Sequence, residues 1–398
     1  MAIEVNLDLP EALQNPTEYF AAARERGNIQ WSSHHNAWMV LDHPGVEEGL
    51  RDAERLSSDK SATFARAARG QSEAFATAVS MLDSWMNFRD EPEHERLRAP
   101  VRRAFTPRAV SSLATEIQMI VDSTLDGMDR SAADLSHDFA RPIPALVIGA
   151  VLGVPPGDRH RFYQWSHDLG QLTFAVNPGG APADEVGCAA TEFIAFFNEL
   201  IERERSEPTG SLLSTIVASS GGMTPLELVG ACTILLFAGH ETTTTLLVNT
   251  LGHLLTHRET LAWLRAHPEA METAVDEFMR VMGPARTLTR KVSVDHERGG
   301  HELWRGQNVF LCVAAANHDP GVFANPAALD LTRDPNPHLG FGWGPHYCLG
   351  ANLARLEAAI ALRTLLERFD TIEPRGDILP PRASALGYGR RPLPARLG

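Results

Sequence analysis

The sequence feature that most constrains the fold is one long helix near the middle of the chain. Thr224-Pro225-Leu226-Glu227 offers a capping threonine, a proline that fits the first turn and a glutamate at the capping-box position. The helix that it opens is expected to extend to about His257. Residues 228–239 are uncharged and apolar all round, which predicts burial on every side. This run of 12 residues is shorter than the roughly 20 that cross a bilayer, so we expect a core helix and no membrane span.

The remaining pattern predicts a mainly α protein with a small β region, which is an α+β fold class. Asn15-Pro16 opens a helix that Gly27 ends, and residues 29–33 and 37–42 read as a short hairpin. Short strands and turns are expected over 290–316. The chain has no repeat or interdomain linker, so residues 1–398 are predicted to form a single domain around the buried central helix. Further helices are predicted over residues 92–104, 108–128, 138–152, 158–174, 184–205, 259–282 and 351–369.

Composition excludes several classes of function. The chain has 36 Lys and Arg against 50 Asp and Glu, a net charge of −14, which disfavours a general nucleic-acid binder. The N-terminus has no basic segment followed by an apolar one, so we expect no signal peptide and a cytoplasmic protein. The four cysteines are widely spaced and form no CxxC pair, which argues against a zinc site and against a disulfide framework.

The segment richest in chemistry is Phe341-Gly-Trp-Gly-Pro-His-Tyr-Cys-Leu-Gly350, which precedes a strong helix pattern. A thiol at the start of a helix meets unpaired backbone N–H groups and the positive end of the helix dipole, and both favour the thiolate. On these grounds three interpretations of Cys348 are open. It is a buried small hydrophobe, a catalytic nucleophile or an axial metal thiolate.

This segment resembles the haem-ligand signature of the cytochrome P450 family, Phe-x-x-Gly-x-His/Arg-x-Cys-x-Gly, and fills every position of it. The resemblance implies the P450 fold and a haem b cofactor whose iron is held by the Cys348 thiolate. It also implies that Phe341 shields the sulfur, that His346 reaches a haem propionate and that Gly350 lets the backbone approach the cofactor. The resemblance extends over residues 85 to 370.

A second motif, Ala238-Gly239-His240-Glu241-Thr242-Thr243, lies inside the central helix. Burying Glu241 is costly unless it has a partner or a task, and four consecutive threonines can loosen the helix by bonding back to earlier carbonyls. The alternative is a buried polar patch satisfied by water or by neighbours. The family resemblance implies that Thr242 orients bound oxygen and its water, that Glu241 feeds protons towards it, and that Ala238 and Gly239 leave room above the iron.

Two further groups gain meaning only from their place in the chain. Glu277-Phe-Met-Arg280 is an i, i+3 ion pair, a spacing that also occurs at Glu93/Arg96 and that contributes little by itself. The resemblance gives it a structural role beside the cysteine loop.

Haem also carries two carboxylates, which need cations or donors. By resemblance, a set of four side chains contacts them: His94, Arg98, Arg290 and His346.

The predicted function is that of a haem-thiolate monooxygenase, which uses dioxygen to hydroxylate or otherwise oxidise a small, largely apolar organic molecule such as a secondary metabolite. Only 50 residues follow Cys348, too few for a fused flavin domain. A separate ferredoxin or flavodoxin with its reductase is therefore expected to supply electrons, with Arg102 and Arg103 as a docking hypothesis.

The predicted substrate pocket rests on the resemblance alone. Arg286 is unusual in it, and it either binds a carboxylate on the substrate or faces outward. The pocket is expected to include the loop near 177–184 and six side chains: Ile234, Phe237, Ala238, Arg286, Leu288 and Leu386.

Three alternative functions remain. One keeps the haem but changes the outcome to oxidative coupling, desaturation or peroxygenation. Another is a non-enzymatic haem sensor or carrier. The last is a cysteine hydrolase without haem, in which His346 would act as the base for Cys348.

Overall fold

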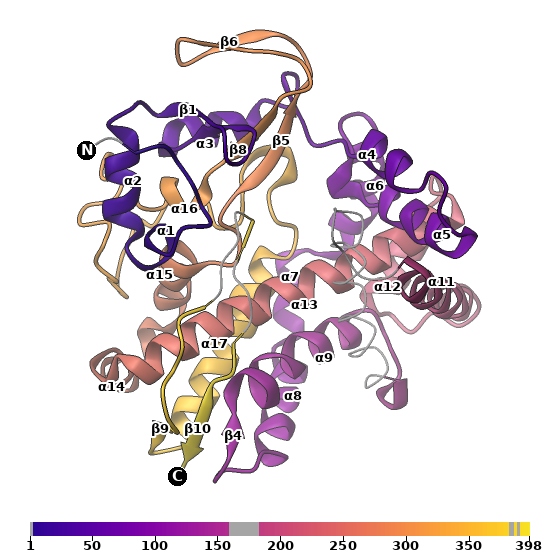
Figure 1. The fold of residues 1–398 in the computed structure, drawn as a ribbon. Coiled ribbons are helices and arrows are strands. Elements are labelled where there is room, and N and C mark those ends of the chain that lie inside the picture. The colour runs from indigo at the N-terminus through magenta and orange to yellow at the C-terminus, as the bar shows by residue number, and fades with distance from the viewer. Residues whose placement is uncertain (1–2, 159–182, 382–385, 388–390) are drawn as a thin grey trace. The chain divides into compact units, whose positions relative to one another are not determined.

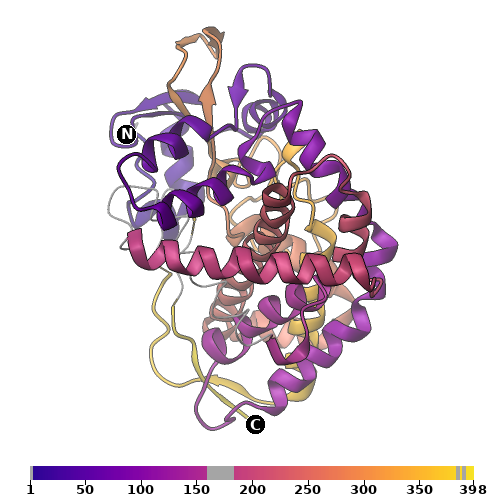
Figure 2. The ribbon, with the colours of Figure 1, turned by 90° about the vertical axis from the view of Figure 1, so that its right-hand side faces the viewer.

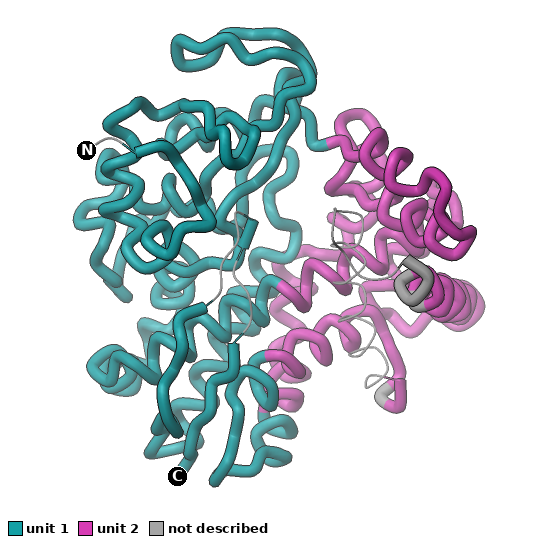
Figure 3. The backbone as a smooth tube through the Cα atoms, in the orientation of Figure 1, with its two compact units in different colours: residues 1–58, 122–140, 242–398 teal, residues 59–121, 141–241 magenta. Residues whose placement is uncertain are grey.

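The computed structural model describes residues 3–158, 183–381, 386–387 and 391–398. The predicted helix over 158–174 and most of the predicted loop near 177–184 therefore lie outside the described residues. The chain divides into two compact units, one made of residues 1–58, 122–140 and 242–398 and the other of residues 59–121 and 141–241 (Figure 3). The single-domain organisation stays a prediction, and each unit is described by itself.

The central helix begins where the sequence predicts. Helix α13 spans Pro225–Thr256, and its start is a reciprocal capping box. The Thr224 N–H donates to Glu227 Oε2 at 2.7 Å, and the Glu227 N–H donates to Thr224 Oγ1 at 3.3 Å. Among the described residues, α13 is the helix long and apolar enough to cross a bilayer, and 67% of its most apolar window is buried. Core helices of soluble proteins pass the same test, so this is weak evidence for a span.

The first unit holds a five-stranded sheet in the order β1-β2-β8-β5-β3. The strands are β1 Ile29–Ser32, β2 Ala37–Val40, β3 Leu56–Ser57, β5 Leu288–Val292 and β8 Asn308–Leu311. Strands β1 and β2 form the predicted hairpin, β2 and β8 pair in parallel, and the other pairs are antiparallel.

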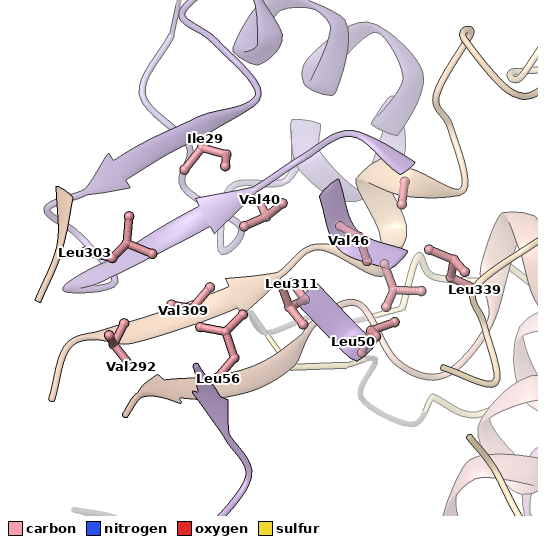
Figure 4. Packing of buried hydrophobic residues seen from close by; sticks show 12 residues of the cluster. Ile29, Val40, Val46, Leu50, Leu56, Val292, Leu303, Val309, Leu311 and Leu339 are labelled. Carbon is pink, nitrogen blue, oxygen red and sulfur yellow. The ribbon is translucent and has the colours of Figure 1, made fainter. Parts of the chain in front are cut away.

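Helix α3 (His43–Arg51) packs Val46 and Leu50 into one apolar cluster with Val40, Leu311 and Leu339 (Figure 4). Because Leu339 lies two residues before Phe341, this cluster anchors the start of the cysteine loop.

Helices make up most of the rest of the first unit. Figure 1 shows the order of these helices along the chain. It also shows the hairpin of strands β6 (His296–Arg298) and β7 (His301–Leu303), which projects from the end of the sheet. The other helices of the first unit are α1 Glu11–Gln14, α2 Pro16–Arg24, α14 Arg258–Ala266, α15 Met271–Met282, α16 Val313–Ala316 and α17 Ala351–Arg368. The remaining strands are β4 Ala133–Asp134, β6 His296–Arg298, β7 His301–Leu303, β9 Ile372–Pro374 and β10 Pro394–Leu397.

The second unit is helical. Its longest helix, α11 (Ala183–Ser206), is seen along its length in Figure 2 and packs against α5 (Glu73–Asp83). Gly187 permits this approach, because a Cβ there would lie 2.7 Å from the backbone of Ala74. The other helices are α4 Ser61–Ala67, α6 Glu93–Ala104, α7 Pro107–Ser112, α9 Pro142–Val151 and α12 Leu212–Ser219, while α8 (Ala114–Asp126) runs from this unit into the first.

The helix predictions that fall on described residues are confirmed, with local corrections. The helix predicted over 108–128 is interrupted at Leu113, which separates α7 from α8. The helix predicted over 259–282 is two helices, because Pro268 cannot continue α14 and opens a short 3₁₀ turn before α15. Residues 135–140 form a π-helical turn, and α9 starts only at Pro142.

Candidate functional site

The cysteine loop, residues 341–350, presents Cys348 at the N-terminal side of α17. The Cys348 N–H donates to the Phe341 carbonyl at 2.9 Å and closes the loop. Gly342 and Gly344 have φ near +71° and +72°, a conformation that favours glycine. A Cβ at Gly344 would also lie 2.8 Å from the Leu50 carbonyl oxygen. Local backbone requirements therefore explain two of the glycines in the motif.

The four cysteines occupy different environments. Cys232 and Cys312 are fully buried, and burial raises the pKa of each thiol to about 12. Cys188 is exposed on α11, whereas Cys348 is partly exposed in its loop. The N-terminus of a helix stabilises negative charge, so Cys348 combines access with an environment suited to a thiolate.

The predicted Glu277–Arg280 pair forms the centre of a buried network. Both side chains are fully buried, and Arg280 donates to the two Glu277 carboxylate oxygens at 2.7 and 2.8 Å. The other Arg280 donors reach main-chain carbonyls of residues 317, 326 and 328 at 2.8, 2.9 and 2.9 Å. These bonds hold α15 to the segment that leads into the cysteine loop.

Sequence reasoning missed two members of this network. Arg333 contacts Glu277 at 3.2 Å, and the Asn336 amide donates to the same carboxylate at 3.1 Å. Both guanidinium groups lie against Phe323, with Arg280 at 5.2 Å and Arg333 at 5.9 Å from the ring centroid. The only sequence signal was the proline-flanked stretch around Arg333, which indicates a turn and names no partner.

Residues 228–236 of helix α13 are buried, as the sequence predicts, and the helix changes character after them. Ala238 and Thr242, four residues apart on one face, are exposed, and Glu241 between them keeps a side-chain exposure of 24%. Thr243 and Thr244 are buried. The helix therefore presents small, acidic and hydroxyl groups along one stripe in its middle, and the role of Glu241 stays a prediction.

The predicted propionate contacts are divided between the two units. In the second unit, His94 is 1% exposed on α6 with Nδ1 2.9 Å from Glu91 Oε1, and Arg98 follows one turn later. In the first unit, Arg290 lies on β5 and is 8% exposed, while His346 lies in the cysteine loop. The structure keeps the residues of each pair within one unit, and their joint role stays a prediction.

The predicted pocket residues are likewise divided. Ile234 is buried on α13, and the Phe237 ring lies 5.3 Å from Trp85, whose indole N–H donates to Thr233 at 2.9 Å. In the first unit Leu288 packs beside the sheet cluster, and Leu386 is 47% exposed.

The structure excludes one of the two alternatives that the sequence left open for Arg286. It is 1% exposed, so it does not face outward. Its guanidinium donates to the Leu7 carbonyl at 2.7 Å and to the Ala12 carbonyl at 3.0 Å. A group so engaged fastens the N-terminal segment, which leaves the substrate-carboxylate hypothesis without support.

The residues of the cysteine loop fit a flat cofactor held by sulfur. Cys348 is accessible, whereas Cys232 and Cys312 are enclosed. A Cβ built on Gly350 would meet no atom within 4 Å, so space lies open beside this glycine. Phe341 is 8% exposed at the base of the loop. This donor set suits a thiolate-bound metal.

Comparison with known proteins identifies the family. The cytochrome P450 family model matches residues 183–397. The chain is 33% identical to the biotin biosynthesis cytochrome P450 of Bacillus subtilis, over 94% of this chain and 93% of that protein. It is 34% identical to 6-deoxyerythronolide B hydroxylase of Saccharopolyspora erythraea, over 91% and 90%.

Solved structures agree. P450BioI, crystallised with an acyl carrier protein bearing a fatty acid, superposes with a TM-score of 0.86 at 32% identity and covers 98% of this chain and 100% of that chain. CalO2 superposes with a TM-score of 0.89 at 26% identity, with 99% of each chain covered. The chain therefore has the mainly helical P450 fold and belongs to the cytochrome P450 family as a haem-iron monooxygenase.

Proposed function

We propose that this cytochrome P450 oxidises a small, largely apolar organic molecule of the secondary-metabolite type, using dioxygen and electrons from a separate protein. The observation that carries the proposal is the stripe on α13, where Ala238, Glu241 and Thr242 share one face of the helix. A small residue, an acid and a hydroxyl on an otherwise buried helix suit oxygen binding and proton delivery.

The haem would be held mainly by the cysteine loop. Cys348 would ligate its iron, Phe341 would cover the sulfur, and Gly350 would let the backbone approach the ring. Four side chains would neutralise the propionates: His94, Arg98, Arg290 and His346. When bound, haem supplies the activation of dioxygen, and a thiolate ligand favours cleavage of the O–O bond.

Two side chains of α13 would manage the proton supply. The Thr242 hydroxyl would hold a water close to the oxygen site, donating and accepting hydrogen bonds in turn. The Glu241 carboxyl would pass protons towards that hydroxyl, because the two residues are adjacent on the helix. Ala238 and Gly239 would leave room beside them.

The substrate class follows from the apolar lining. Ile234, Phe237, Leu288 and Leu386 would contact the substrate through hydrocarbon surface, which binds apolar molecules without fixing their identity. The relatives support the same class, since they are named for biotin biosynthesis and for hydroxylation of 6-deoxyerythronolide B. Oxidative coupling, desaturation and peroxygenation would use the same site, and analysis of the products separates them from hydroxylation.

Bacterial class I P450s receive electrons from separate redox partners, and we place this protein in the cytoplasm with a ferredoxin or flavodoxin and its reductase. Arg102 and Arg103, at the end of α6, would contact an acidic donor. Arg102 also donates to Glu95 at 2.6 Å, so Arg103 is the better test. Changing Arg103 to Glu is expected to slow electron transfer and to weaken its dependence on salt.

A spectrum of the reduced protein under carbon monoxide tests the thiolate assignment. The parent and the Cys188→Ala control are expected to show the absorption band that marks a thiolate ligand. Cys348→Ala is expected to lose it. An unchanged spectrum in Cys348→Ala would refute the assignment, and a colourless parent would favour the cysteine hydrolase instead.

Product yield tests the stripe on α13. Thr242→Ala is expected to consume NADH while forming less product, because the proton supply fails after oxygen has bound. Thr256→Ala is the matched control, since this threonine bonds Gly252 at the far end of the same helix. Equal product per NADH in both variants would remove Thr242 from the mechanism.

A further inference from the structure

A second charged network lies behind the cysteine loop. Arg355 on α17 donates through Nε to Asp276 Oδ1 on α15 at 2.7 Å, and His338 Nε2 lies 3.2 Å from the same oxygen. His338 Nδ1 accepts the Gly340 N–H at 3.1 Å. The Nδ1 atom is therefore unprotonated, and Nε2 is the donor to Asp276.

This network contacts the loop on both sides of its motif. The Arg355 guanidinium lies over the Phe341 ring at 4.3 Å, and its side chain hydrogen-bonds Tyr347, the residue before Cys348. The Phe341 carbonyl accepts the Cys348 N–H. The His338 ring packs against Phe341 at 5.7 Å. By contrast, the bonds that Arg280 makes go to Glu277 and to carbonyls of residues 317–328.

Both members of the pair are charged. Burial alone would raise the pKa of Asp276, but hydrogen bonds from His338 and Arg355 lower it. Burial alone would lower the pKa of Arg355, but hydrogen bonds to Asp276 and Tyr347 raise it. The side chains are 30% and 31% exposed, so the field between them is screened less than that of a surface pair. Arg355, the positive member of the pair, is therefore the one that contacts the cysteine loop.

We propose that the Asp276–Arg355 pair tunes the electron affinity of the haem iron held by Cys348, with Arg355 as the tuning charge and Asp276 as its counter-charge. This inference rests on the proposed role of Cys348. Reduction adds one electron from the donor to the iron, Fe(III) + e⁻ → Fe(II), and a nearby positive charge stabilises the added negative charge. Asp276 offsets part of that effect, and His338 holds the carboxylate in place.

A charge-neutralisation experiment separates tuning from mere support of the fold. Arg355→Gln leaves the Asp276 charge uncompensated, so the ratio of ferrous to ferric protein at a fixed applied potential is expected to fall by about threefold or more. Asp276→Asn leaves Arg355 uncompensated and is expected to raise that ratio by a similar factor. The double variant keeps neither charge and is expected to lie near the parent. A residue that only supported the fold would move both single variants in the same direction.

Two further variants complete the test. Arg355→Lys keeps the charge and is expected to shift the ratio less than Arg355→Gln does. Arg363→Gln removes a charge from the same helix, where Arg363 lines a surface cavity of about 210 Å³, and is expected to leave the ratio unchanged. Shifts in one direction, or no shift in any variant, would overturn the inference. A parent that lacks the thiolate band under carbon monoxide would instead overturn the proposed role of Cys348.

Discussion

Two Glu-x-x-Arg sequences in this chain share one spacing and differ in environment. Glu277 and Arg280 on α15 are fully buried. Glu93 and Arg96 on α6 lie 2.6 Å apart, but their side chains are 55% and 37% exposed. Helical spacing brings both pairs together equally well. What differs is the number of other groups that depend on each arginine.

The buried pair is stable only because its surroundings complete it. Removing two charges from water is costly, and their attraction offsets that cost only when every remaining donor finds an acceptor. Arg280 meets this condition through three main-chain carbonyls, and Glu277 through Arg333 and Asn336. Arg96 reaches the Gly222 carbonyl and Glu227, in contact with solvent. The same four-residue pattern is thus a structural centre in one place and a surface feature in the other.

The largest effect is expected from breaking the buried pair. Arg280→Met leaves the Glu277 carboxylate buried without its main partner and frees three carbonyls, so the free energy of unfolding is expected to fall by about 3–5 kcal/mol. Urea denaturation measures the loss. Arg280→Lys keeps the charge but cannot reach all acceptors at once, and should lie between the parent and Arg280→Met. A midpoint unchanged in Arg280→Met would show that the network carries no stability.

A smaller effect is expected at Arg286, a buried arginine that bonds main-chain carbonyls of the N-terminal segment. Arg286→Met removes its bonds to Leu7 and Ala12, and hydrogen bonds to a charged group contribute about 1.5–3 kcal/mol. Limited proteolysis should then cut within the first 15 residues sooner than in the parent. Arg286→Lys is the control, since its ammonium group can still hydrogen-bond one of the two carbonyls. Arg286→Met could instead change substrate binding and leave the rate of proteolysis unchanged. In that case Arg286 does not hold the N-terminal segment, and it contacts the substrate.

Arg286 also shows where sequence reasoning stopped. Patterns set by neighbours in the chain were predicted well: the capping box at Thr224, the hairpin at 29–40 and the start of α17 after Gly350. Patterns set by distant segments were not. Arg333 meets Glu277 across 56 residues, and Arg286 meets Leu7 across 279, and no local periodicity encodes either contact.

A third effect, on how the free energy of unfolding depends on pH, is expected from His318, which is close enough to Arg280 to feel its charge. His318 is 2% exposed, its Nδ1 lies 2.8 Å from the Ala314 carbonyl oxygen, and burial lowers its pKa from 6.5 to about 4, with Arg280 adding to the shift. Below pH 6.5 the unfolded chain binds a proton that the folded chain does not, so the free energy of unfolding falls as pH falls. The loss from pH 7 to pH 5.5 is expected to be about 1 kcal/mol.

Urea denaturation at several pH values measures this slope. His318→Gln removes the titration and should flatten the slope by that amount. Burial and the adjacent His257 also lower the pKa of His253 to about 4. His253→Gln is therefore a matched variant, which measures the contribution of this second histidine to the slope. If the slope survives both substitutions, neither histidine causes it.

The smallest effect is expected from the exposed pair. Exposed ion pairs contribute about 0–1 kcal/mol and are screened by salt, so a double-mutant cycle of Glu93→Gln and Arg96→Gln should give a coupling energy below about 1 kcal/mol that disappears in high salt. Arg96→Gln alone is expected to cost more than Glu93→Gln alone, because Arg96 also bonds Glu227 at the start of α13. A coupling as large as that of Glu277 and Arg280 would mean that exposure does not decide what this spacing contributes. A weak, salt-sensitive coupling would instead show that exposure to solvent limits what this spacing contributes on α6.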